Sequence, residues 1–158
     1  MENTKHLTEV LKSQISLYTE LADLIVAEKE AIVSWAVEET VELTKKKAEL
    51  LRREKIQEQA RRTLLKKMAA EAGDELNLND VIALITDEAE AEHMRELQKT
   101  LVALISRLQA ENLSLRSLYI TNNKLISDFF QAAGFTEGVG YGPAGTENKK
   151  VYTIQRFG

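Results

Sequence analysis

The sequence predicts an all-α protein: an elongated antiparallel bundle or coiled coil of three long helices plus one short helix, with a flexible C-terminal tail. Apolar residues recur at alternating three- and four-residue steps over most of the chain, which is the period of packed helices. Six of the seven glycines and the only proline lie in residues 134–158. We therefore divide the chain into a helical bundle domain, residues 1–134, and a Gly-rich tail, residues 135–158.

The first long helix is expected over residues 4–33, with Asn3 or Thr4 as its N-cap. Its apolar stripe consists of Leu7, Val10, Leu11, Leu17, Tyr18, Leu21, Leu24, Ile25, Ala31 and Ile32. Gln14 and Glu28 interrupt this stripe. Polar residues inside a helical interface often fix its register, so we expect that role for both.

A turn is expected near Ser34 and Trp35, although neither glycine nor proline marks it. An unbroken helix over residues 4–72 would be about 100 Å long at 1.5 Å per residue, which is too long for a chain of this size. We expect Ser34 to cap a new helix, and Val33 and Trp35 to seal the corner. The second helix then covers residues 36–72 and ends at Gly73.

A short helix is predicted between residues 74 and 86, with Asn79 as its cap. The third long helix follows from Glu88 to Gly134. Asp87 and Glu90 have the spacing of a capping box at its start.

The third long helix carries the most regular seam in the chain, and we expect the bundle to be organised around it. The seam consists of Leu97, Leu101, Leu104, Leu108, Leu115, Leu118, Leu125 and Phe129. Glu111 and Asn122 fill its two gaps. We expect the unbroken half, residues 97–108, to face the chain's own helices, and the half from Glu111 onward to be shared with a binding partner.

Composition excludes several classes of function. The 158 residues include no cysteine, which excludes disulfides, thiolate metal sites and cysteine nucleophiles. The N-terminus has no apolar signal core and no apolar run approaches the roughly 20 residues that span a bilayer, so we expect a cytoplasmic protein without stable membrane insertion. Glu90 and His93 have the Glu-x-x-His spacing of di-iron bundles, but no second motif completes such a site. We assign no catalytic, metal or cofactor-binding residue and expect no enzyme.

Charge is unevenly distributed between two adjoining segments. Residues 45–67 hold ten Lys/Arg and three Glu, and residues 68–96 hold nine Asp/Glu and one Arg. We interpret the basic run as a solvated helix face paired with the acidic segment. Nucleic-acid binding is the alternative, and the net charge of −4 and the lack of interleaved aromatic residues argue against it.

Four stretches together resemble the FlgN family of flagellar type III export chaperones. They are residues 21–32, residues 37–51 (VEETVELTKKKAELL), residues 108–112 (LQAEN) and the Tyr141-Gly142-x-x-Gly145 tail. The resemblance implies a cytoplasmic chaperone that binds the helical C-terminal region of hook-associated proteins, the hook–filament junction proteins. It also implies that the chaperone keeps them soluble and delivers them to the flagellar export gate.

The resemblance further implies where the partners bind. The groove for the hook-associated protein would consist of Leu115, Leu118, Tyr119, Asn122, Leu125, Ile126 and Phe129. We assign Tyr141 to docking at the export gate as a hypothesis, and the alternative is an ordinary tyrosine of the tail. The alternative to an export chaperone is a coiled-coil structural or adaptor protein that forms homo-oligomers through the same seam, and the measured mass distinguishes the two.

Overall fold

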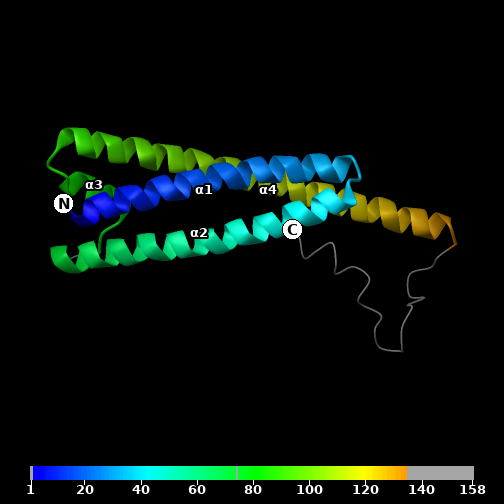
Figure 1. Ribbon diagram of the computed structural model, residues 1–158, viewed down its shortest axis with the longest axis horizontal. Coiled ribbons are helices and arrows are strands. Elements are labelled where there is room, and N and C mark those ends of the chain that lie inside the picture. The colour runs from blue at the N-terminus through cyan, green and yellow to red at the C-terminus, as the bar shows by residue number, and fades with distance from the viewer. Residues whose placement is uncertain (1, 74, 135–158) are drawn as a thin grey trace, which may run out of the picture.

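Four helices make up the part of the chain that the computed structural model describes, residues 2–73 and 75–134 (Figure 1). They are α1 (Glu2–Val33), α2 (Val37–Ala72), α3 (Leu78–Leu84) and α4 (Glu88–Ala132). No strand occurs in these two ranges. The prediction of an all-α chain with three long helices and one short one is confirmed.

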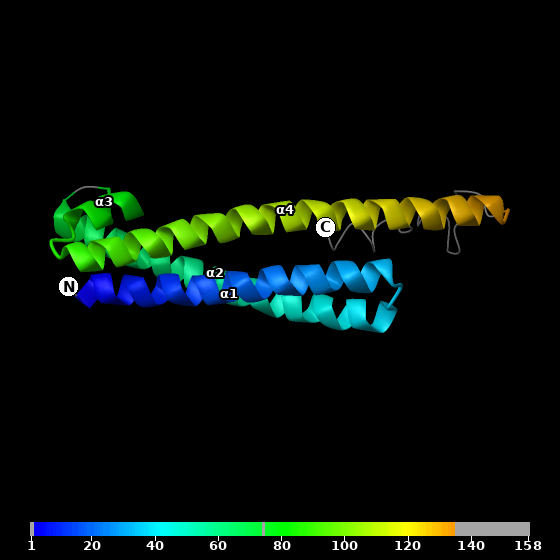
Figure 2. The same ribbon diagram turned by 90° about the horizontal axis from the view of Figure 1, so that it is seen from above.

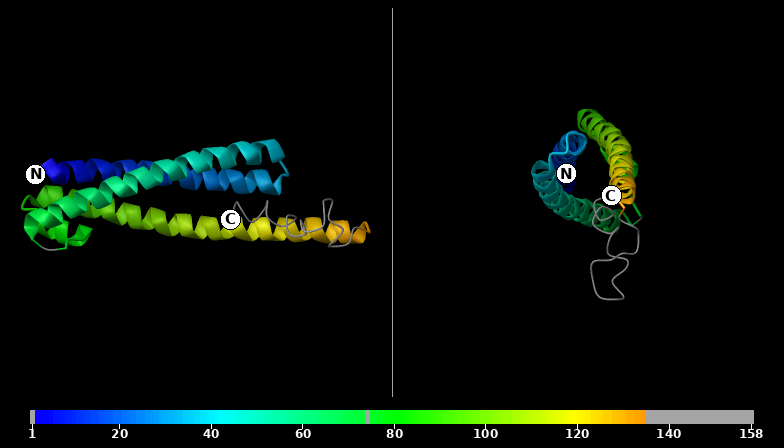
Figure 3. Two further views of the ribbon diagram at one scale, coloured as in Figure 1. Left: turned by 90° about the horizontal axis from the view of Figure 1, so that it is seen from below. Right: turned by 90° about the vertical axis from the view of Figure 1, so that its right-hand side faces the viewer.

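The central helix of the bundle is α1. It runs antiparallel to α2 and parallel to α4, and both of these long helices pack extensively along it (Figure 1). Viewed from the end, α2 and α4 approach α1 from different sides (Figure 3). The expectation that the seam of α4 organises the bundle is therefore wrong, because α1 alone contacts both other long helices along their length.

The predicted turn between the first two helices is confirmed at residues 34–36. The backbone N–H of Ala36 donates to the carbonyl of Ala31 (2.9 Å) and closes the turn. Ser34 does not cap the next helix, since its hydroxyl donates back to the carbonyl of Glu30 (2.8 Å). The N-cap of α2 is Ala36, which makes no side-chain capping bond. Gly73 ends α2 in the left-handed conformation (φ 82°), as predicted.

The other helix starts follow the capping rules, with two changes from the predicted caps. Asn77, not Asn79, caps α3, because it directly precedes the first helical residue and forms a capping box with Asp80. The expected cap at Asn3 or Thr4 is also wrong: α1 already begins at Glu2, and the Asn3 amide instead contacts α2. Asp87 caps α4 by accepting from two backbone N–H groups.

Two apolar clusters form the core of the bundle. The first lies where α1 begins and joins three helices through Leu7, Leu11, Leu78, Val81, Ile82, Ala91, Met94 and Leu101. The second lies along the middle and consists of Leu17, Leu21, Ala22, Leu24, Ile25, Ile32, Leu50, Leu108 and Leu115. Leu50 is the only α2 residue in either cluster, because α2 is solvated over most of its surface. The prediction that residues 97–108 of α4 face the chain's own helices is confirmed.

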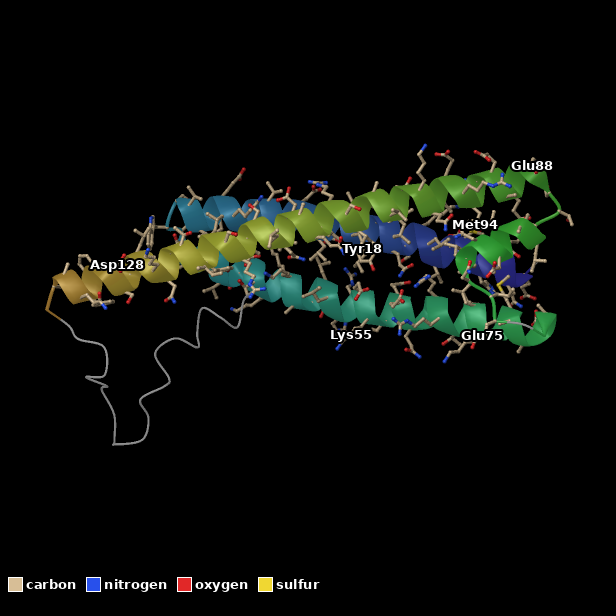
Figure 4. The ribbon with its side chains drawn as sticks, turned by 180° about the vertical axis from the view of Figure 1, so that it is seen from behind. Tyr18, Lys55, Glu75, Glu88, Met94 and Asp128 are labelled. Atoms are coloured by element: carbon tan, nitrogen blue, oxygen red, sulfur yellow. The ribbon has the colours of Figure 1, made fainter. Side chains whose placement is uncertain are left out.

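A polar layer lies between α1 and α2 beside the first cluster. The buried Gln14 amide donates to Glu58 (3.2 Å), and the Tyr18 hydroxyl donates to Glu54 (2.9 Å). Figure 4 shows Tyr18 between the two helices. Arg61 also bonds Glu58 (2.8 and 2.9 Å), and this guanidinium lowers the pKa of the Glu58 carboxyl to about 2. Burial, together with the hydrogen bond to Glu54, raises the pKa of Tyr18.

The lowered pKa of Glu58 predicts a loss of stability in acid. A carboxyl whose pKa is lower in the folded state stabilises the fold above its ordinary pKa and loses that contribution as pH falls. We expect the free energy of unfolding to decline from about pH 4.5 down to about pH 2. Glu58→Gln should flatten this part of the profile. Urea unfolding at a series of pH values measures the difference, and parallel profiles for the two proteins would contradict the prediction.

The expected pairing of basic and acidic segments is wrong for the described residues. The Lys/Arg side chains of residues 45–67 pair only with Glu42, Glu49 and Glu58 on α2 itself and with Glu28 on α1. Arg95, on α4, pairs with its own neighbours Glu88 and Glu92. The reason is geometric: most side chains of the basic run are exposed, with Lys55 on the side of α2 away from the other helices, whereas Glu75 and Glu88 lie at one end of the rod (Figure 4).

Candidate functional site

The C-terminal part of α4 continues beyond the hairpin formed by α1 and α2 (Figure 2). Its last contacts with the middle cluster are made by Leu115, Leu118 and Tyr119. Beyond Tyr119, α4 has no neighbouring turn of α1 to pack on, because α1 ends at Val33. The apolar face of α4 nevertheless continues to Phe129, at the same helical spacing. An apolar face without a partner helix is thus left at this end of the rod.

Between the part of α4 that follows Tyr119 and the α1–α2 turn lies an open hollow of about 420 Å³. It is lined by Trp35, Leu125, Ile126, Phe129 and Phe130, and we call it the Trp35 hollow. Phe129 is 68% exposed and Trp35 is 59% exposed, and the two phenylalanine rings meet edge to face with their centroids 5.8 Å apart. Three aromatic residues gathered on an open surface are typical of an interaction site.

Trp35 is held at the hollow by an unusual backbone conformation. Its φ is +57°, the left-handed region, and it is the one non-glycine residue of the described chain with positive φ. For a residue with a bulky side chain this conformation costs about 1–2 kcal/mol. Sequence reasoning treated Trp35 as a corner seal and missed its place in the hollow, because no local pattern marks the turn.

Replacing Trp35 separates the cost of the backbone from the contribution of the side chain. Glycine adopts positive φ without strain, so Trp35→Gly should raise the free energy of unfolding by about 1 kcal/mol relative to Trp35→Ala. Both variants remove the same exposed indole, and their difference therefore reports the backbone alone. Thermal or urea unfolding of the pair measures it. Equal stability of the two variants would show that the turn relaxes once the indole is gone.

The structure divides the seven residues predicted for the groove. Leu125, Ile126 and Phe129 line the hollow. Leu118 and Tyr119 are half-buried against the middle cluster, and Asn122 is half-buried beyond them. Leu115 is only 2% exposed and belongs to the core. The eighth predicted residue, Tyr141, lies outside the described residues.

A buried polar node anchors α4 at Tyr119, just before the part of the helix that extends beyond the α1–α2 hairpin. Glu28 of α1 is fully buried and accepts from Lys47 Nζ of α2 (2.9 and 3.2 Å) and from the Tyr119 hydroxyl of α4 (2.7 Å). Burial and the neighbouring Glu28 carboxylate raise the pKa of Tyr119. Lys29 pairs with Glu111 beside this node. Side chains from all three long helices thus meet at one point. These contacts fix the position of α4 relative to the α1–α2 turn.

Within residues 2–73 and 75–134, no group of three or more His, Cys, Asp or Glu side chains is arranged to hold a metal ion. His93 is exposed on the first turns of α4. Among the described helices, none is both long and apolar enough to cross a membrane.

Comparison with known proteins gives one match that covers nearly the whole chain. A family model described as FlgN protein matches residues 1–149. The match includes all four helices and both sides of the Trp35 hollow. The comparison with curated proteins and the comparison with solved structures each gave no match.

Proposed function

Because the chain belongs to the FlgN family of flagellar type III export chaperones, we propose that it binds the helical C-terminal region of hook-associated proteins in the cytoplasm. The bound protein would be kept soluble and delivered to the flagellar export gate. Members of this family are chaperones rather than enzymes, so the activity that we propose is reversible binding of a protein.

The observation that carries this proposal is the apolar end of α4 facing Trp35. A helix of the substrate that is apolar on one face would lie against Leu125, Ile126 and Phe129, with its apolar residues at i, i+3, i+4 and i+7. Trp35 and Phe130 would cover its sides. Such a helix tends to self-associate when it is uncovered, and a hollow that covers it prevents this.

The groove would extend from the hollow toward the middle of α4, along Asn122, Tyr119 and Leu118. It would end at Leu115, which is buried. The Glu28 node supports this arrangement because it holds Tyr119 against the hairpin. The first part of α4 would then maintain the fold while its last turns receive the substrate.

Copurification with a hook-associated protein tests the proposal. The full chain, used as bait, should retain the C-terminal helical region of such a protein and should not retain the same protein after that region is deleted. The mass of the free chain should fall clearly below that of a tetramer at low micromolar concentration. A stable tetramer that ignores flagellar proteins would overturn the proposal in favour of a self-assembling coiled coil.

Tyr141 is proposed to act at the export gate rather than in substrate binding. Tyr141→Ala should therefore leave substrate affinity unchanged and reduce secretion of hook-associated proteins. The two readouts are a binding titration and the amount of secreted junction protein from cells that carry the variant. Loss of substrate binding together with export would contradict this division of roles.

A further inference from the structure

The outer face of α2 carries a row of cations that the chaperone function described above does not use. We call Lys45, Arg52, Lys55, Arg62 and Lys66 the basic stripe. At 3.6 residues per turn these five positions fall within about a third of the helix circumference. All five side chains are exposed, and Figure 4 shows Lys55 on the side of α2 that faces away from the other helices.

The stripe is only partly neutralised by the protein itself. Three of its members have an acidic neighbour within one turn: Lys45 pairs with Glu42 (2.9 Å), Arg52 with Glu49 (2.8 Å) and Arg62 with Glu58 (2.8 Å). Lys55 and Lys66 form no ion pair within residues 2–73 and 75–134. The three glutamates of this segment lie outside the sector that the stripe occupies. A face with a net positive charge, concentrated at Lys55 and Lys66, is thus presented to solvent.

The length and composition of the stripe indicate which kind of polyanion it binds. It extends for about 32 Å along α2. α2 contains no aromatic residue, and the exposed apolar side chains beside the stripe, Leu51 and Ile56, lie apart from each other, whereas protein interfaces depend on clustered aromatic anchors. The stripe also lacks the aromatic residues that stack on single-stranded nucleic acid. Long, flexible cations along one face of a helix suit a surface whose anions can move to meet them, as lipid headgroups do.

We infer that the basic stripe binds the surface of an anionic lipid bilayer. The attachment is electrostatic and peripheral, without insertion. It leaves the Trp35 hollow accessible, since α4 and α2 pack on different sides of α1 (Figure 3). The inference does not depend on which protein fills the hollow, because the two surfaces share no residue.

Sedimentation of the full chain with lipid vesicles tests the inference, without any substrate present. The chain should sediment with vesicles in which phosphatidylglycerol replaces part of the phosphatidylcholine, and it should stay in solution with phosphatidylcholine alone. Because the Debye length shortens with salt, binding should fall as sodium chloride is raised. No sedimentation with the anionic vesicles would overturn the inference.

Two matched variants locate the contact. Lys55→Gln with Lys66→Gln should weaken vesicle binding about tenfold or more, since each cation near an anionic surface contributes separately. Lys99→Gln with Lys124→Gln removes the same charge from exposed positions on α4 and should bind as the parent does. Circular dichroism checks that both variants fold. An equal loss in the two variants, or tighter binding to duplex DNA than to the anionic vesicles, would also overturn the inference.

Discussion

Lys47→Met is expected to lower the free energy of unfolding by about 3–5 kcal/mol. Lys47 Nζ is the cationic partner of Glu28, a carboxylate with no exposed surface. Removing that cation leaves a buried charge with the Tyr119 hydroxyl as its close donor (2.7 Å), because the Thr44 hydroxyl is 3.5 Å away and bonds the carbonyl of Thr40 (2.8 Å). Most small domains are stable by only about 5–15 kcal/mol, so this single change removes a large part of the total. Urea unfolding followed by circular dichroism measures it.

The neighbouring lysine provides the control for this prediction. Lys46 is exposed and forms no ion pair within the described chain, so Lys46→Met should change the stability by less than about 0.5 kcal/mol. A second control replaces the whole node: Glu28→Leu with Lys47→Met and Tyr119→Phe leaves no buried charge and should recover most of the lost stability. Equal effects of Lys46→Met and Lys47→Met would show that the buried pair does not stabilise the fold.

Ile126→Asp combined with Phe129→Asp is expected to weaken binding of the hook-associated helix about a hundredfold or more. Both side chains line the Trp35 hollow, and two carboxylates there would have to be desolvated against an apolar helix face. The fold should survive, because neither residue belongs to the two core clusters. A calorimetric titration with the substrate's C-terminal segment measures the affinity, and thermal unfolding verifies the fold.

The opposite face of α4 offers a matched pair for comparison. Leu113 and Ile120 are 67% and 61% exposed, and their spacing places them away from the hollow. Leu113→Asp with Ile120→Asp adds the same two charges to the same helix and should leave the affinity close to that of the parent. If the hollow variant binds as tightly as this control, the substrate does not occupy the hollow.

The helices could be predicted from the sequence because their signals are local. The three- and four-residue steps of apolar residues define each long helix, and Gly73 and Asp87 mark two of the ends. The central place of α1 has no such local signal. A seam shows that a helix is packed, whereas the number of helices that pack on it depends on the arrangement of all three.

The candidate site could be predicted in part for the same reason. Leu125, Ile126 and Phe129 follow the periodicity of α4, and they do lie together. The same periodicity includes Leu115, and only the end of α1 at Val33 decides that Leu115 is buried while Phe129 is exposed. Trp35 could not be placed, since its positive φ arises at a turn without glycine or asparagine.

The fluorescence of Trp35 reports whether a substrate helix occupies the Trp35 hollow, because Trp35 is the only tryptophan of the chain and it lines the hollow. The hook-associated helical segment, chosen to contain no tryptophan, is added while calorimetry records binding independently. Occupation of the hollow predicts a shift of the Trp35 emission to shorter wavelength that saturates at the stoichiometry found by calorimetry. Calorimetric binding with an unchanged Trp35 emission would contradict the claim and place the substrate elsewhere on the chaperone.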